Sequence, residues 1–301
     1  MTSLRFLLRV GFTSAMLMLA ACGNTPSRTA AHVSPDALMA DAMQRQIRER
    51  DPARALATMR MAAAQAPDRA DVVWLYSQLC GQTRGCESES ADAALRRLDP
   101  ANGAAWLNAL GRARERNDVA AENEILDAIG DSERFDVYWN TLTSKITLAA
   151  SARVAAQNSL PVSDALTAIL NGTIGWLSGI LLPGFDTLGE ACSAARAGNP
   201  VMAERCRRVA AVLMRGDSYM AESVGLGIAQ RMARPNSAEV VDVAQRIQYS
   251  RAQRDAAGQV IASQVERDKF TAELLKLMSS LHREQDVFAA VLRWAGVTEM
   301  K

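Results

Sequence analysis

The residues of this chain most capable of chemistry are its five cysteines, because only two histidines accompany them. Cys80 and Cys86 flank a short stretch that begins and ends with glycine and must therefore turn. Cys192 and Cys206 lie at equal distances on either side of Asn199, which stands between a glycine and a proline. Equal spacing about a turn places two residues on facing sides of a helical hairpin. We therefore predict the disulfides Cys80–Cys86 and Cys192–Cys206.

The small number of histidines restricts the catalytic and metal chemistry that the chain can support. His32 stands in a polar N-terminal stretch, and His282 stands among charged residues of a predicted helix. A Ser-His-Asp or Cys-His centre would lack its usual base, and no histidine accompanies the cysteines as in many zinc sites. We expect no enzyme activity, no metal and no cofactor. The net charge of +1 gives no reason to expect a nucleic-acid partner.

One stretch is faintly similar to the lytic transglycosylases of the bacterial envelope. Glu222-Ser223 is followed by a glycine-rich segment that begins at Gly225. The resemblance implies a helix-borne glutamate that acts as a general acid. In that family, however, many more residues separate the Glu-Ser pair from the glycine-containing stretch. We therefore expect Glu222 to be a solvated or paired helix residue without a catalytic role.

The N-terminus begins with a basic stretch and continues with an apolar run that is too short to cross a bilayer, as is typical of an export signal. The run ends in Leu19-Ala20-Ala21-Cys22, which resembles the lipobox of bacterial lipoproteins. The resemblance implies that residues 1–21 are a signal peptide that is removed. It also implies that Cys22 receives a diacylglycerol thioether and that its new amino terminus is acylated, for example by palmitate. Several acyl chains hold a protein to a membrane far more firmly than a single chain does.

The residues after Cys22 indicate where a lipoprotein of this kind would work. Gly23 replaces the aspartate that retains enterobacterial lipoproteins in the inner membrane, so we expect the outer membrane, with the protein facing the periplasm. Residues 22–34 are small and polar and form a predicted lipidated tether. Ser34, Pro35 and Asp36 then supply the cap, the first-turn proline and the acid that favour a helix start.

The composition favours an all-α protein, because alanine is abundant, aromatic residues make up only 5% and alternating β-branched segments are scarce. Trp74, Trp106 and Trp139 are 32 and 33 residues apart, and each follows a break in the helical pattern. Two short amphipathic helices fit into each period. This arrangement resembles the tetratricopeptide repeat, whose period is 34 residues. We therefore predict degenerate tetratricopeptide-like helical hairpin repeats over residues 35–150.

Residues 151–301 are predicted to form a C-terminal all-helical domain, a helical bundle. Its segment 165–185 is uncharged and long enough to cross a membrane. The flanking residues are acidic rather than basic, and one crossing would place Cys192 and Cys206 in a reducing compartment. We expect a buried central helix, followed by a separate helix over 186–197. The same segment could also line an apolar cavity.

These features favour a non-enzymatic scaffold that binds a protein or peptide in the cell envelope, because helical repeats form extended concave surfaces. The partner-binding residues that we predict are polar side chains at helical spacing: Asn108, Arg112, Arg116, Asn140 and Lys145. Such donors suit backbone amides and carboxylates. Two alternatives fit the same sequence. One is an inhibitor or immunity lipoprotein that acts against an envelope hydrolase, and the other is a carrier of a hydrophobic ligand that uses segment 165–185.

Overall fold

The computed structural model describes residues 33–158, 166–234, 236–264 and 267–297. The predicted signal peptide, Cys22, His32 and almost all of the predicted tether lie outside the described residues. From Val33 onward the chain forms one compact unit. Within the described residues every regular element is a helix, which confirms the predicted all-α fold.

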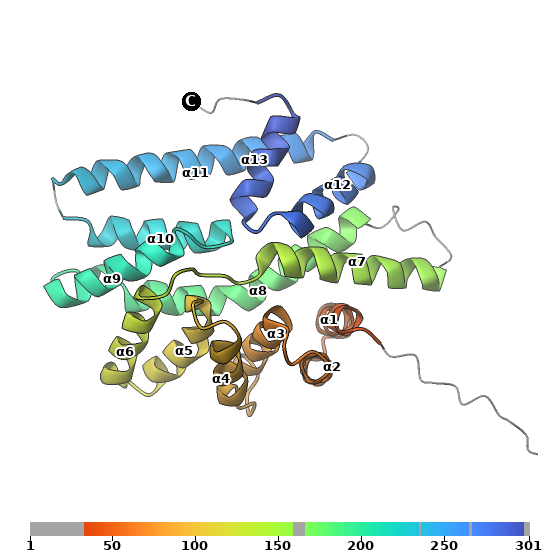
Figure 1. Cartoon of the computed structure of the whole chain (residues 1–301), viewed down its shortest axis with the longest axis horizontal. Helices are drawn as coiled ribbons and strands as arrows, with labels where there is room; N and C mark the ends of the chain where they lie inside the picture. Colours follow the sequence, from red (N-terminus) through yellow and green to blue (C-terminus); the bar gives the residue numbers. More distant parts are fainter. Residues whose placement is uncertain (1–32, 159–165, 235, 265–266, 298–301) are drawn as a thin grey trace, which may run out of the picture. The chain divides into compact units, whose positions relative to one another are not determined.

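The first six α-helices pair as three consecutive hairpins, drawn in red to yellow in Figure 1. These pairs are α1 (Pro35–Gln44) with α2 (Pro52–Gln65), α3 (Ala70–Gly81) with α4 (Glu89–Leu98), and α5 (Leu107–Glu115) with α6 (Val119–Gly130). The helices that follow are α7 (Trp139–Asn158), α8 (Leu166–Ala191), α9 (Pro200–Leu213), α10 (Tyr219–Met232), α11 (Ala238–Ala262), α12 (Arg267–Ser280) and α13 (Glu284–Trp294).

Side-chain caps explain where several of these helices begin. The Ser34 hydroxyl accepts a hydrogen bond from the Ala37 amide at 3.2 Å, and Pro35 occupies the first turn of α1, as the sequence predicts. Asp118 caps α6 in the same way, and Asn199 caps α9. Such caps satisfy backbone amides that have no partner inside the helix. They also place the breaks between helices at sites that the sequence marks.

The three tryptophans that define the sequence repeat occupy different environments. Trp74 lies inside α3 with 0% exposure. Trp106 ends a short 3₁₀ turn before α5 and lies 4.6 Å beneath the Arg96 guanidinium, and Trp139 opens α7. Each tryptophan thus lies in or next to the helix that follows a break, but their contacts differ. Three hairpins precede α7, but the period that begins at Trp139 is one long helix rather than two short ones. The tetratricopeptide-like repeat stays a prediction.

The long apolar segment forms α8, which continues through Pro183 to Ala191. The expectation of a separate helix over 186–197 was wrong, because the helix does not break where segment 165–185 ends. Pro183 lies on the exposed side of the helix, next to Leu182, while Leu181 and Phe185 are buried. Burial on both sides of the proline keeps the helix continuous.

Helix α8 is long and apolar enough to cross a membrane by length and composition. In the described structure it packs against α3 and α5 on one side and against α10 and α12 on the other, and α7 runs along it (Figure 1). One face, which includes Leu177 and Ile180, is buried by these helices. This arrangement is that of a central helix in a packed body.

Two hydrophobic clusters stabilise the compact unit. The larger extends from α1 to α10, and the smaller joins the start of α8 to α12 and α13. Helix α7 spans the predicted domain boundary at residues 150 and 151 and ends at Asn158, where the sequence indicates a break.

Both predicted disulfides are confirmed. Cys80 at the end of α3 is bonded to Cys86 in the following loop, and Cys192 just after α8 is bonded to Cys206 in α9. The first disulfide closes the loop between α3 and α4, and the second ties α8 to α9 across the turn at Asn199.

Candidate functional site

A polar groove of about 660 Å³ lies between the loop closed by Cys80–Cys86, helix α5 and the C-terminal part of α8. We call it the loop groove. The end of α3 and the loop contribute Gln78, Gly81, Gln82, Thr83, Arg84, Gly85, Cys86, Glu87 and Ser88, and the start of α4 contributes Glu89. Helix α5 contributes Leu107, Asn108, Gly111, Arg112 and Glu115, and α8 contributes Pro183, Gly184 and Thr187. This volume falls within the usual range of ligand sites.

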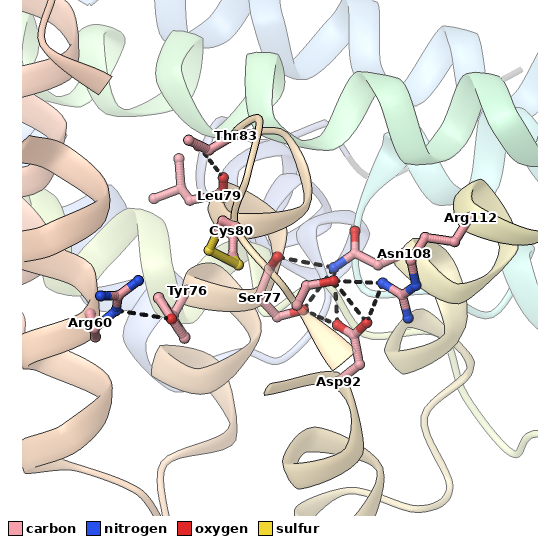
Figure 2. Close-up of a disulfide and its surroundings, with 11 residues drawn as sticks. Arg60, Tyr76, Ser77, Leu79, Cys80, Thr83, Asp92, Asn108 and Arg112 are labelled. Carbon is pink, nitrogen blue, oxygen red and sulfur yellow. Dashed lines mark hydrogen bonds and ion pairs between the residues drawn. A yellow bond between two sulfur atoms is a disulfide. The ribbon is translucent and has the colours of Figure 1, made fainter. Parts of the chain in front are cut away.

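The floor of the loop groove is organised around the carboxylate of Asp92, which is 1% exposed. Figure 2 shows Asn108 and Arg112 pointing from α5 toward Asp92 on α4, with Ser77 of α3 beside them. The Asn108 amide donates to the Asp92 carboxylate at 3.0 Å and to the Ser77 hydroxyl at 2.8 Å. The Arg112 guanidinium lies 2.8 Å from the other Asp92 oxygen. Three helices are therefore joined by one buried carboxylate.

Local sequence places these groups together. Asp92 lies in the first turn of α4, and the Ser88 hydroxyl donates to it at 3.1 Å. Gly81 ends α3, where a Cβ would lie only 2.7 Å from the Asn108 side-chain oxygen. Glycine is therefore required for α5 to approach α3 so closely. In the loop, Gly85 has a φ of +79°, a conformation that glycine adopts without strain.

Arg112 is fixed but retains donors for a ligand. Its Nη1 group contacts Asp92 and donates to the Ser88 hydroxyl at 2.6 Å, and its Nε contacts the Glu89 carboxylate at 3.1 Å. Within the described residues these bonds leave the Nη2 group for a molecule in the groove. A guanidinium that is held in this way loses little side-chain freedom when it binds a carbonyl or carboxylate oxygen.

The structure brings only part of the predicted partner-binding set together. Asn108 and Arg112 line the loop groove, and Arg116 is exposed at the C-terminal end of α5. Asn140 is 1% exposed and donates to the Leu281 and His282 carbonyls at 2.9 and 3.2 Å. The Lys145 ammonium lies 3.3 Å from the Asp71 carboxylate. Asn140 and Lys145 thus make intramolecular bonds away from the groove and do not extend a stripe from α5.

Several residues that line the loop groove were not predicted from the sequence. Arg84 and Glu87 lie on the disulfide loop, which the repeat pattern treats as an insertion, and Gly111 and Glu115 lie on α5. The pair of cysteines was the available signal, since a disulfide fixes the position of the residues around it. Asp92 was missed as well, because nothing in the sequence shows that its carboxylate lies beneath Arg112.

A second group of polar residues joins distant parts of the chain. We call Asp136, Asp217, His282 and Glu284 the junction cluster. The Asp217 carboxylate accepts hydrogen bonds from the amides of Val137 and Trp139 at 3.0 and 2.8 Å. The His282 Nε2 lies 3.1 Å from Asp136. These bonds connect the start of α7 to the segments before α10 and α13.

Burial changes the proton affinity of two carboxyl groups in the junction cluster. Burial raises the pKa of Asp217 to about 7, and the nearby Asp136 carboxylate adds to this rise. Removal of the Glu284 carboxyl from water likewise raises its pKa to about 7. Glu284 accepts a hydrogen bond from the Tyr219 amide at 2.7 Å, which opposes the rise. These groups link helices in the interior.

Glu222, the residue with a faint similarity to a catalytic acid, lies on α10. Its carboxylate accepts a hydrogen bond from the Gln285 amide at 2.9 Å. Glu222 is therefore a paired helix residue, as expected from the sequence.

An apolar groove of about 480 Å³ lies between α12 and α13. We call it the apolar groove. Phe270 and Trp294 lie beside it with their rings 5.5 Å apart, and the Trp294 side chain is 66% exposed. The predicted apolar segment 165–185 does not contribute to its lining. Ala168, Ile169 and Gly172 of that segment instead line a cavity of about 230 Å³ with α1 and α7. Within the described residues no group of His, Cys, Asp and Glu side chains is arranged to hold a metal ion.

No family model matches the chain, and the comparisons with curated proteins and with solved structures gave no match.

Proposed function

We propose that the protein is a non-enzymatic scaffold of the bacterial cell envelope that binds a protein or peptide partner in the loop groove. In this proposal lipid on Cys22 holds the protein in the outer membrane, with the body in the periplasm. The N-terminal sequence supports the location, and the two disulfides suit an oxidising compartment.

The loop groove is the observation that carries the proposal. It combines a floor fixed by Asp92, free donors on Arg112 and a rim held by the Cys80–Cys86 disulfide. A preorganised surface loses less freedom on binding than a mobile one, so more of its contact energy appears as affinity. Its mixture of amides, hydroxyls and charges matches the hydrogen-bonding groups of a polypeptide.

Gly111 provides a direct test. A Cβ at this position would meet no atom within 4 Å, and the residue lies in the middle of α5 on the wall of the groove. The substitution Gly111→Leu therefore adds a side chain on the groove wall, with open space at its Cβ. It also removes a helix-interior glycine, which favours α5 by up to about 1 kcal/mol. We expect an unchanged or raised melting temperature together with loss of partner capture.

The measurement is a crosslinking pull-down from intact envelopes with the lipidated full chain. Gly258→Leu is the matched control, because Gly258 lies inside α11, away from the groove, and also has open space at its Cβ. The proposal requires one protein that is captured by the wild type and by Gly258→Leu but not by Gly111→Leu. Equal capture by Gly111→Leu would exclude the loop groove. If the captured protein is a hydrolase that loses activity, the inhibitor or immunity hypothesis replaces the scaffold.

The apolar groove favours a second candidate function, the carrier of a hydrophobic ligand. Its lining residues are Gln264, Lys269, Phe270, Glu273, Leu274, Lys276, Leu277, Ser280, Ala290, Val291 and Trp294. This site differs from segment 165–185, where the sequence suggested a cavity. Native mass spectrometry of the purified chain should show a copurifying small molecule that Ala290→Trp displaces. A spectrum without any bound molecule would count against a carrier.

A further inference from the structure

We propose that the loop groove recognises an extended polypeptide segment through a lysine or arginine side chain of that segment. This inference rests on the proposed function, because it names the chemistry of the partner that the same groove would bind. Three observations carry it: the charge of the lining, the way Arg112 is neutralised, and the space beside Gly111.

The first observation is the sign of the charge in the loop groove. In the lining the three carboxylates of Glu87, Glu89 and Glu115 outnumber the two guanidinium groups of Arg84 and Arg112 by one. The buried Asp92 carboxylate, which pairs with Arg112 from beneath, adds one more negative charge. Groups of one sign along a cleft with protein walls favour ligands of the opposite sign. The partner segment is therefore expected to carry positive charge.

The second observation is that Arg112 does not neutralise the carboxylates of Glu87 and Glu115 at the rim of the groove. Its guanidinium lies between the buried Asp92 carboxylate at 2.8 Å and the Glu89 carboxylate at 3.1 Å. Glu87 and Glu115 are exposed on opposite walls, one on the disulfide loop and one on α5. An ammonium or guanidinium group that enters the groove would meet these two carboxylates.

The third observation concerns the backbone of the partner. Gly111 leaves open space on the α5 wall, so that a main chain can approach the helix. The Nη2 group of Arg112, on the next residue, can then donate to a main-chain carbonyl oxygen. An extended segment offers such a carbonyl and a side chain on the opposite side of its backbone. One segment can thus use the Arg112 donor and place a cation at the rim.

Two blocked peptides test the charge preference without knowledge of the natural partner. Both have the sequence Gly-Ser-Ala-X-Ala-X-Ala-Ser-Gly with acetylated and amidated ends, and X is lysine in one and glutamate in the other. The readout is the ¹⁵N spectrum of the lipidated full chain in a nonionic detergent. Four glycines line the groove and supply well-resolved amide signals: Gly81, Gly85, Gly111 and Gly184. Titration of these signals gives the dissociation constant of each peptide. We expect the lysine peptide to bind on the order of tenfold more tightly than the glutamate peptide.

A charge-reversed variant tests which residues cause the preference. In Glu87→Lys/Glu115→Lys we expect the preference to reverse, so that the glutamate peptide binds more tightly. The control Glu124→Lys/Asp242→Lys changes the net charge equally at exposed positions on α6 and α11 and should keep the lysine preference. A higher salt concentration should weaken the binding of the lysine peptide more than the binding of the glutamate peptide, because salt screens the attraction between exposed charges.

The outcomes separate this inference from the proposed function. Equal shifts of the groove glycines by both peptides would overturn the cation preference and leave a peptide-binding groove. A stronger response to the glutamate peptide, or an unchanged preference in the charge-reversed variant, would also overturn it. If neither peptide shifts these glycines, both the inference and the assignment of peptide binding to this groove fail.

Discussion

Asp92 is the residue on which the floor of the loop groove depends. Its buried carboxylate holds Arg112 and Asn108 and accepts a hydrogen bond from Ser88. Removal of one partner from a buried ion pair leaves the other charge without compensation. The side chains of Asn108 and Arg112, which line the groove, are therefore positioned by a residue beneath them.

We expect Asp92→Ala to lower the free energy of unfolding by on the order of 3 kcal/mol, because Arg112 and Asn108 both lose their buried acceptor. Urea unfolding followed by circular dichroism measures the change. Glu89→Ala is the control, since the Glu89 side chain is 59% exposed although it pairs with the same Arg112. Its effect should stay below about 1 kcal/mol. Similar losses in the two variants would show that Asp92 is not the centre of the floor.

The junction cluster predicts a pH dependence of stability. An unfolded glutamate titrates near about 4.3, whereas the pKa of Glu284 in the fold is raised to about 7 by burial. Folding therefore favours the protonated form, and the free energy of unfolding falls as pH rises between about 4.5 and 7, by at most about 1.4 kcal/mol per pH unit for each such group. Asp217 acts in the same direction.

Glu284→Gln should reduce this slope, because glutamine does not ionise and its carbonyl can still accept the Tyr219 amide bond. Melting temperatures measured from pH 4.5 to 8 give the comparison. The control Asp286→Asn changes an exposed acid on the same helix and should leave the slope unchanged. A slope that is equal in wild type and Glu284→Gln would contradict the assignment.

The residue scale also shows what sequence can predict about the site. Asn108 and Arg112 were found because polar residues at helical spacing suggested one exposed face. The same argument selected Asn140, whose side chain is in fact buried against the carbonyls before α13. Helical periodicity predicts which residues share a face, but it does not show which distant segment covers that face.

At the scale of elements, α8 presents a buried face and an exposed face. Leu177 is 1% exposed within the packed body, and Leu182 is 48% exposed. Leu177→Asp should lower the free energy of unfolding by on the order of 4 kcal/mol, because it buries a charge without a partner. Leu182→Asp should change it by less than about 1 kcal/mol.

Urea unfolding of the purified chain measures both α8 variants. A helix that crosses a bilayer would be sensitive to a charge on its lipid-facing side as well, and Leu182→Asp would then impair membrane insertion. Equal loss from both substitutions would therefore contradict a central helix with one exposed face.

Several helix starts could be predicted because they carry caps and prolines, as Ser34 and Asn199 show. The end of α8 could not be placed in this way. Pro183 normally disfavours a helix interior, but buried contacts on both sides, at Leu181 and Phe185, maintain the helix through it. Tertiary packing therefore stabilises helical structure here against the local preference of proline.

At the scale of the whole molecule, the proposed location depends on Cys22. Cys22→Ala should release the protein from the membrane fraction and abolish labelling by a fatty-acid probe, because no acyl chains would be attached. Fractionation of cells followed by immunoblotting measures the change. Cys80→Ala/Cys86→Ala is the control for loss of a cysteine elsewhere and should remain membrane-bound. Membrane retention of Cys22→Ala would contradict lipid attachment at this residue.

Contacts between residues far apart in the sequence could not be predicted from the sequence. The disulfides were predictable because each joins cysteines close in sequence across a turn. The bonds of Asp217 to the start of α7 span about eighty residues, and no local pattern marks either end. Predictions of pairing across such separations need the packed fold, since many alternative partners would satisfy the same carboxylate.

The long-range bonds at the start of α7 also imply an order of events during synthesis. A chain emerges from the ribosome beginning with its N-terminal end. The amides at the start of α7 can form their hydrogen bonds only after Asp217 has been synthesised. The buried Asn140 amide can form its bond only after Leu281 has been synthesised. The first half therefore acquires its last buried partners only when nearly the whole chain has emerged. Such distant contacts slow folding. For the export that we propose, a fold that is completed late would keep the chain open to threading through a translocation channel.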